Sequence, residues 1–245
     1  MATPDWQLPD GIDRGLWDYL HSLTIAQEYD QYIATSPVIA RDVAFCEQWF
    51  AEPAPLVDLG CGTGRLALHF ADKQFPCTAV DLSQPMLDEV SHKATESHTH
   101  LTCVQANLVD LSVLQNHTFR YAACLFSTLG MICGAENRLQ ALKEFRRIVQ
   151  PGGTLVLHVH NANYRFGMGL GRKGKEAGDR TMKQLRAGIE LTIHHYTWGE
   201  IVRQLHAAGW SVVGSEPIST ANDGVLNRPH WLPRYRAHGY LLAAQ

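Results

Sequence analysis

The chain has 245 residues, of which 45% are hydrophobic and 18% charged, enough for one α/β domain with a sizeable core. Its formal net charge of −3 excludes a global field that would attract nucleic acid or an anionic membrane. No apolar run reaches transmembrane length, and the first residues lack the basic start and apolar core of a signal peptide. Six scattered cysteines without a C-x-x-C pair are typical of free thiols, so we expect a cytoplasmic protein.

The first fifty residues predict helices ahead of an α/β core. Gly15–Tyr32 has helical apolar spacing, and Ser36–Pro37 predicts an N-cap followed by a second helix that ends near Phe50. We expect residues 1–50 to act as a lid over the core, with Tyr19, Tyr29 and Tyr32 as candidates to face a ligand. The alternative is that all three tyrosines only pack helices.

Strand and helix signals then alternate, which predicts a parallel sheet with right-handed crossovers. The predicted strands are Leu56–Leu59, Cys77–Asp81, Leu101–Gln105, Tyr121–Phe126 and Thr154–His160. Helices should follow Gly64 and Ser83, and a third should cover Glu136–Val149. Residues 55–160 therefore form the predicted core of a single domain that spans residues 1–245.

The segment 161–186 differs in composition, with five glycines and seven basic residues against two acidic ones. Because few of its residues could build a core, 161–190 is predicted to be a flexible insertion beside the substrate. Within 191–245 a helix is expected at Trp198–Ala208 and strands at Trp210–Val213 and Arg234–Ala244. The last strand follows another by a loop alone, so it should pair antiparallel. A further strand is predicted at Ile189–His195.

A glycine-rich turn follows the first core strand, in the sequence Asp58–Leu59–Gly60–Cys61–Gly62–Thr63–Gly64. Glycine accepts positive φ and lets backbone N–H groups approach a ligand at a helix N-terminus. A tight turn without a ligand is the alternative. The dinucleotide fingerprint G-x-G-x-x-G is not met, and Asp58 would repel a pyrophosphate but suits a ligand that carries an ammonium group.

These residues resemble motif I of the class I S-adenosylmethionine (SAM)-dependent methyltransferases, of the small-molecule type similar to methyltransferase domains 11 and 25. Ala79–Met86 resembles the ribose-binding motif of that family, and Leu142–Leu157 resembles its helix, Pro-Gly-Gly turn and fifth strand. The resemblance implies a Rossmann-like fold with a mostly parallel seven-stranded sheet, an antiparallel last strand and helices on both faces. It also implies SAM as the cofactor.

The resemblance also implies which residues bind SAM. The ribose is expected on Asp81, and the adenine near Asn107, which departs from the usual aspartate of the family. Asp81 could instead cap the next helix, but Ser83 can serve as that cap. The full predicted cofactor set is Asp58, Gly60, Cys61, Gly62, Gly64, Asp81, Leu82, Met86, Asn107, Leu108, Phe126, Ser127 and Tyr32.

The sequence says less about the methyl acceptor than about the cofactor. The segment after the fourth strand lacks an Asn/Asp-Pro-Pro-Tyr/Phe signature, and no proline lies beside Cys124, which disfavours the DNA and protein amide enzymes and covalent base chemistry. A small-molecule acceptor methylated on N or O is therefore predicted, and the basic insertion suggests an anionic one. RNA or protein methylation, an NAD-dependent oxidoreductase and a non-catalytic SAM-binding protein stay open as alternatives.

His160 is the predicted general base, if the reaction needs one. It ends the fifth strand, at the sheet edge where open α/β folds bind ligands, and neutral imidazole suits proton transfer near pH 7. His158 is expected to be a core histidine, and His194 or His195 could reach the same place. The thirteen histidines lack the spacing of a structural zinc site, so no metal is predicted.

Overall fold

A computed structural model describes residues 3–164, 172–173, 175–183, 188–221 and 223–245. Seven strands form its central sheet: β1 (Leu56–Leu59), β2 (Cys77–Asp81), β3 (Thr102–Gln105), β4 (Phe119–Cys124), β5 (Val149–His160), β9 (Val212–Ile218) and β10 (Gly239–Ala244). Their order is β3-β2-β1-β4-β5-β10-β9, and β10 pairs antiparallel with both β5 and β9. The predicted fold class, with its reversed last strand, is confirmed.

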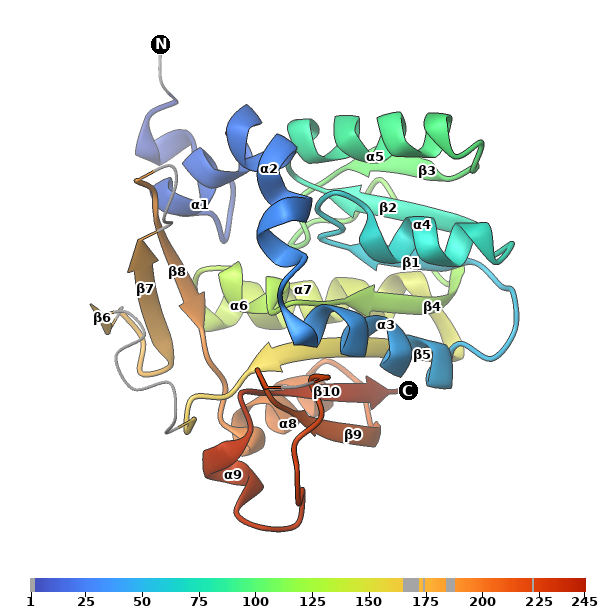
Figure 1. Ribbon diagram of the computed structural model, residues 1–245. Helices are drawn as coiled ribbons and strands as arrows, with labels where there is room; N and C mark the ends of the chain where they lie inside the picture. Colours follow the sequence, from blue (N-terminus) through green and yellow to red (C-terminus); the bar gives the residue numbers. More distant parts are fainter. Residues whose placement is uncertain (1–2, 165–171, 174, 184–187, 222) are drawn as a thin grey trace.

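Helices cover both faces of this sheet (Figure 1). On one face lie α3 (Pro37–Trp49), α4 (Arg65–Asp72) and α5 (Gln84–Glu96). On the other face lie α7 (Ala135–Ile148) and α8 (Trp198–Ala207), after the single turn α6 (Thr128–Met131). The strands are therefore buried on both sides, which explains why the central ones read as nearly continuous apolar runs.

The N-terminal segment forms a short 3-10 turn (Asp5–Gln7), α1 (Arg14–Leu20) and α2 (Leu23–Ile33). The single helix predicted over Gly15–Tyr32 is thus split in two. The break occurs because Ser22 caps a new helix, with its hydroxyl accepting from the Ile25 N–H at 3.3 Å. Figure 1 shows α1 and α2 beside the edge at which the parallel strands end.

A second, three-stranded sheet contains β6 (Arg172–Lys173), β7 (Asp179–Lys183) and β8 (Glu190–His194). The prediction of a loop throughout 161–186 is therefore wrong for β7, which pairs antiparallel with β8. Long-range pairing overrides the weak local signal, and the Thr181 and Thr192 hydroxyls hydrogen-bond across the two strands at 2.9 Å. Gly167, Gly169, Gly171 and Gly174, on which the predicted flexibility rested, lie outside the described residues.

Several strand boundaries also differ from prediction. The fifth strand begins at Val149 and not at Thr154, and β9 covers Val212–Ile218 and not Trp210–Val213. The fourth strand ends at Cys124, two residues before Phe126. The last strand begins at Gly239, because the short helix α9 (Pro233–Arg236) occupies the start of the predicted range. Proline at the first helical position and a left-handed Leu232 (φ +45°) set that helix.

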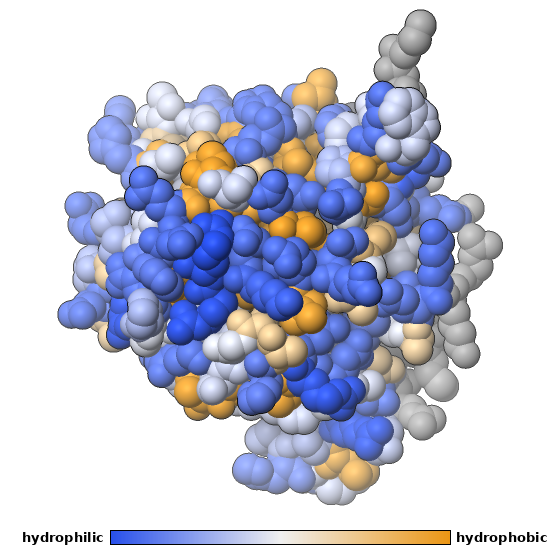
Figure 2. Space-filling model, turned by 180° about the vertical axis from the view of Figure 1, so that it is seen from behind, coloured by the Kyte–Doolittle hydropathy of each residue, from blue (hydrophilic) through white to orange (hydrophobic). Residues whose placement is uncertain are grey.

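The surface presents both polar and apolar side chains. Figure 2 shows the face opposite to that of Figure 1, where polar side chains predominate and apolar ones form scattered groups. None of the helices in the described ranges combines the length and the apolar character that a bilayer crossing needs.

Candidate functional site

The glycine-rich turn joins β1 to α4 in a conformation that requires glycine at its centre. Gly60 and Gly62 have φ values of +72° and +53°. A Cβ added at Gly60 would lie 2.3 Å from Cγ2 of Thr128, so no larger residue fits there. The Gly62 N–H donates to Oδ2 of Asp81 at 2.9 Å, which ties the turn to the carboxyl end of β2.

Asp81 lies at the centre of the site. Only 7% of this residue is exposed, and Oδ1 accepts from the Ser83 N–H at 2.9 Å. Burial raises the pKa of its carboxyl group, while the backbone N–H groups of Ser83 and Gly62 oppose that rise. Ser83 caps α5 as predicted, accepting from the Met86 N–H at 3.3 Å, so the capping function does not require Asp81.

A cavity opens above Asp81, between the N-terminal helices and the ends of the strands. Seven of the predicted cofactor residues line it: Gly60, Gly62, Asp81, Leu82, Met86, Asn107 and Leu108. The sequence did not identify Ile12, Leu16, Leu20, Thr128, Met131 and Ile132, and it named Tyr19 and Tyr29 only as candidates. One buried carboxylate among apolar walls fits a nucleoside, with the carboxylate available to ribose hydroxyls and the apolar side chains to a base.

Asn107 lies in this cavity wall but is already engaged. Its Nδ2 donates to the backbone oxygen of Asp10 at 2.9 Å, and its Oδ1 accepts from the Val109 N–H at 3.2 Å. The side chain thereby fixes the turn after β3 against the N-terminal segment. Its assignment to the adenine remains a prediction.

A second cavity adjoins the first on the other side of the glycine turn. The two share Tyr29, Gly60, Gly62 and Thr128. The second also includes the predicted Asp58, Cys61 and Phe126, together with Ile33, Ile39, Thr63, Arg65, Leu66 and Leu125. Gly64 lines neither cavity, and a Cβ there would lie 2.8 Å from Cγ2 of Val90, so this glycine allows α4 and α5 to approach.

Asp58 lies buried beneath the turn, where Oδ2 accepts from the Ala67 N–H at 3.2 Å. Burial raises the pKa of its carboxyl group to about 7, although Arg65 acts in the opposite direction. The group therefore titrates near neutrality, and ionisation is favoured by any cation placed beside it.

This pKa predicts a pH-dependent stability. A carboxyl whose pKa is raised from about 3.9 in the unfolded chain stabilises the fold fully below that value, and the contribution is lost as pH rises through 7. The free energy of unfolding should thus fall by about 2–3 kcal/mol more between pH 5 and pH 8 in the native protein than in Asp58→Asn. Urea unfolding of both proteins at the two pH values measures the difference. Parallel pH profiles would contradict the assignment.

The predicted lid residue Tyr32 does not lie in the site. It is 50% exposed and lines neither cavity, whereas Tyr29 lines both and Tyr19 lines the first. The helix phase explains this correction: Ala26, Tyr29 and Ile33 form the inward stripe of α2, and Tyr32 points away from it. Burial raises the pKa of Tyr29 to about 12, so its hydroxyl stays protonated.

Beyond β4 the chain passes through two consecutive left-handed residues, Phe126 (φ +51°) and Ser127 (φ +62°). Such backbone strain in non-glycine residues is often found at functional sites. Phe126 lines the second cavity, as expected. Ser127 is buried behind it, where its hydroxyl accepts from the His160 N–H at 3.2 Å, and the neighbouring Thr128 faces the cavities instead.

Four histidines gather at the end of β5. The ring centroid of His160 lies 5.6 Å from that of His158, 5.1 Å from His195 and 4.8 Å from His238. The Phe126 ring meets His158 and His160 edge-on, at 6.1 and 6.4 Å, so the cluster adjoins the second cavity. Burial, with the other histidines as a secondary cause, lowers the pKa of His160 well below 6.5.

His158 is a buried core residue, as predicted, and its Nδ1 pairs with Oδ1 of Asp42 at 2.9 Å. Sequence reasoning missed both Asp42 and His238. No local signal connects them, because Asp42 lies on α3 and His238 immediately precedes β10.

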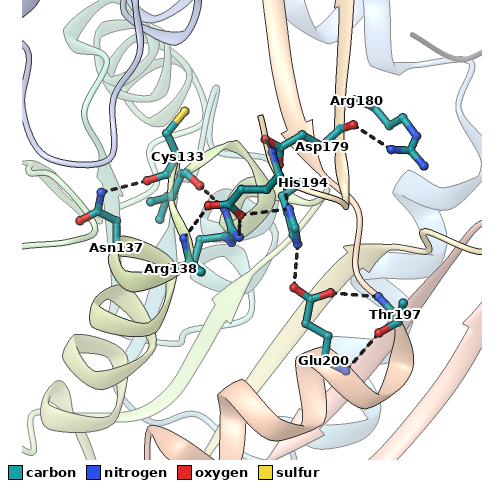
Figure 3. A network of polar contacts seen from close by, with 11 residues as sticks. Cys133, Asn137, Arg138, Asp179, Arg180, His194, Thr197 and Glu200 are labelled. Atoms are coloured by element: carbon teal, nitrogen blue, oxygen red, sulfur yellow. Dashed lines mark hydrogen bonds and ion pairs between the residues drawn. The ribbon is translucent and has the colours of Figure 1, made fainter. Parts of the chain in front are cut away.

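His194, considered as an alternative base, belongs to a different network (Figure 3). Its Nδ1 pairs with Oδ1 of Asp179 at 2.8 Å, and its Nε2 pairs with Oε1 of Glu200 at 2.9 Å. Nearby, Arg138 donates to Oε2 of Glu176 at 2.5 Å. Since both ring nitrogens of His194 face carboxylates, the network joins β7 and β8 to α8 and leaves neither nitrogen for an acceptor.

Comparisons with known proteins agree with this geometry. Residues 56–153 match a family described as methyltransferase domain. The chain is 29% identical to the malonyl-[acyl-carrier protein] O-methyltransferase of Pseudescherichia vulneris over 131 residues, 54% of this chain and 48% of that protein. The chain spans about half the length of the curated relatives it matches.

Two solved structures share the fold over nearly the whole chain. An S-adenosylmethionine-dependent methyltransferase from Clostridium acetobutylicum gives a TM-score of 0.66 at 16% identity and covers 91% of this chain and 97% of that one. The 1,6-didemethyltoxoflavin-N1-methyltransferase of Burkholderia thailandensis gives 0.65 at 18%, covering 97% and 92%. The predicted class I methyltransferase fold is confirmed, and the match over residues 56–153 agrees with the predicted methyltransferase domain.

Proposed function

We propose that this chain, whose residues 56–153 match a methyltransferase domain family, transfers a methyl group from SAM to a nitrogen or oxygen atom of a small molecule. The observation that carries the proposal is the carboxylate of Asp81. It is held by the Gly62 and Ser83 N–H groups at the floor of a cavity that the N-terminal helices cover. This arrangement suits a nucleoside cofactor, and the family match indicates which one.

In this proposal different residues of the two cavities bind different parts of SAM. Asp81 accepts hydrogen bonds from the ribose hydroxyls, and the apolar side chains of Leu82, Met86 and Leu108 enclose the base. Asp58, beneath the turn, favours the ammonium group. SAM supplies a methyl group that is already activated by the sulfonium, so the protein needs mainly to hold the acceptor in line and exclude water.

In this proposal the acceptor binds beside the second cavity, because Phe126 there contacts both the cavity and the histidine cluster. His160 is the candidate to take a proton from it, and its lowered pKa keeps the ring neutral at pH 7. The similar proteins include both an O-methyltransferase and an N1-methyltransferase, so both acceptor atoms stay within the proposal. An anionic acceptor, a cytoplasmic location and the absence of nucleic acid as a partner remain predictions.

The alternatives are separated by one experiment. Methyl-labelled SAM is incubated with the protein and, in parallel, with a metabolite extract, an RNA fraction and a protein fraction, using Asp81→Ala as the inactive control. Label transferred to a small molecule supports the proposal, whereas label in RNA or protein reassigns the acceptor. Tight SAM binding without transfer to any fraction would indicate a non-catalytic binding protein. The NAD-dependent alternative is already opposed by the family match and by the antiparallel β10.

Two tyrosines on α2, one inside the cavities and one outside them, allow a matched pair of variants to test the predicted lid. Tyr29→Ala removes an aromatic wall shared by both cavities, and we expect SAM to bind roughly tenfold more weakly. Tyr32→Ala removes an exposed ring from the same helix and should leave the affinity unchanged. Isothermal titration of both variants measures the contrast, and equal affinities would show that α2 does not touch the cofactor.

A further inference from the structure

Four buried imidazole nitrogens at the end of β5 have no hydrogen-bond partner within the described residues. They are Nε2 of His158, Nδ1 of His160, Nε2 of His195 and Nδ1 of His238. Buried polar atoms in native proteins nearly always find a partner, so an unsatisfied group is often explained by an ion or a water. Three of the four, those of His158, His160 and His238, lie close enough together to share one partner.

Strand pairing brings three of these side chains together. His158 and His160 lie two residues apart on β5, so they point to the same face of the sheet. His238 directly precedes β10, whose first residue, Gly239, pairs with His160. Ligand atoms of His158, His160 and His238 all lie within 4.8 Å of one another.

The backbone leaves room for this approach. A Cβ added at Gly239 would lie 3.3 Å from Nε2 of His158 and 2.5 Å from the backbone oxygen of Val159. Glycine at this position therefore keeps the start of β10 close to β5. It also keeps the space next to Nε2 of His158 free of a side chain.

Asp42 determines which nitrogen of His158 carries the hydrogen. Its buried carboxylate pairs with Nδ1 of His158 at 2.9 Å, and its other oxygen accepts from Nη2 of Arg65 at 3.2 Å. An ionised carboxylate only accepts, so Nδ1 of His158 is the donor and Nε2 keeps its lone pair. Carboxylate–histidine pairs of this kind orient metal-ligating histidines in many metalloproteins.

We propose that His158 Nε2, His160 Nδ1 and His238 Nδ1 bind a divalent first-row transition metal ion, zinc in the first instance. Three imidazole nitrogens are a common ligand set for zinc and leave one coordination position open. Nitrogens bound to zinc at about 2.1 Å lie roughly 3.4 Å apart, so the rings need to turn by about an ångström from their present positions. Because Phe126 contacts two of the three rings, the site lies at the edge of the second cavity.

The proposal concerns metal binding alone and does not depend on methyl transfer. The experiment uses the full chain, stripped with a chelator and dialysed, then titrated with Zn²⁺ and separately with Co²⁺ as a spectroscopic probe. We expect one tight equivalent of zinc per chain and the visible absorption bands of four-coordinate Co²⁺. A titration without a tight stoichiometric site overturns the proposal and leaves the proposed methyl transfer untouched.

Variants then locate the site. His158→Asn and His238→Asn should each weaken the tight equivalent by at least about a hundredfold, and Asp42→Asn by roughly tenfold. His92→Asn is the matched control, because its side chain is 67% exposed on α5, far along the chain from the cluster. Circular dichroism verifies that each variant is folded, and His→Gln replaces any that is not. A tight equivalent that survives the loss of both His158 and His238 would assign the metal to another place and contradict the proposal.

Discussion

Replacing Asp81 by alanine is expected to weaken SAM binding by at least tenfold while the protein stays folded. A buried carboxylate that accepts hydroxyl hydrogen bonds contributes about 1.5–3 kcal/mol, which corresponds to about a tenfold or larger change in affinity. The measurement is isothermal titration with SAM, together with thermal unfolding of the variant. Native affinity in Asp81→Ala would remove the central claim of the proposed function.

Two further variants separate ligand binding from loop support, since Asp81 also accepts from the Gly62 and Ser83 N–H groups. Asp81→Asn keeps one acceptor oxygen but loses the charge, so it should retain more of the turn's order than alanine and still bind SAM weakly. Asp88→Ala removes an exposed carboxylate from α5 and serves as the control with unchanged affinity. A loss in all three variants would point to a general effect on α5.

Replacing His160 by asparagine is expected to lower kcat by about a hundredfold or more while SAM affinity stays intact. This is the usual scale of lost acid–base catalysis. Because burial lowers the pKa of His160 well below 6.5, the acid limb of the native kcat–pH profile should lie below that pH, with a level rate above it. The limb should be absent from the profile of the variant.

A base and a metal ligand at His160 give different patterns among its neighbours. If His160 acts only as a base, His158→Asn and His238→Asn should keep most of the rate. If it is a metal ligand, all three variants should lose the bound metal. A His160→Asn protein that keeps both the rate and the acid limb would move the search to His195, since both nitrogens of His194 face carboxylates, or to a reaction without a base.

Local patterns anticipated the parts of the site that lie within one strand–turn–helix unit. The three glycines and Asp58 lie within seven residues of each other, and Asp81 ends the next strand with Ser83 as the helix cap. The conformations of such turns depend mainly on residues close in sequence. The turn and the buried carboxylate of Asp81 could therefore be located from the sequence, and seven of the predicted cofactor residues do line the first cavity.

Two other features could not be predicted from the sequence, because they depend on the orientation of a packed helix and on pairing between strands. Tyr29 and Tyr32 are equally plausible from composition, but only the packing of α2 decides which ring turns inward. The pairing of β7 with β8 gave no periodic signal in a glycine-rich and basic segment. Both outcomes depend on contacts with elements far away in the chain.

The sequence by itself determined the class of the fold, the position of the glycine turn and the position of Asp81 at the end of the next strand, because these follow from short-range periodicity and backbone freedom. Only the tertiary structure decided how the histidines converge. His158 and Asp42 are 116 residues apart, and His238 reaches them through the insertion of β10 between β5 and β9. Side chains so distant in sequence meet only once the sheet has formed, since strand order and register, not local preference, set the distances between them.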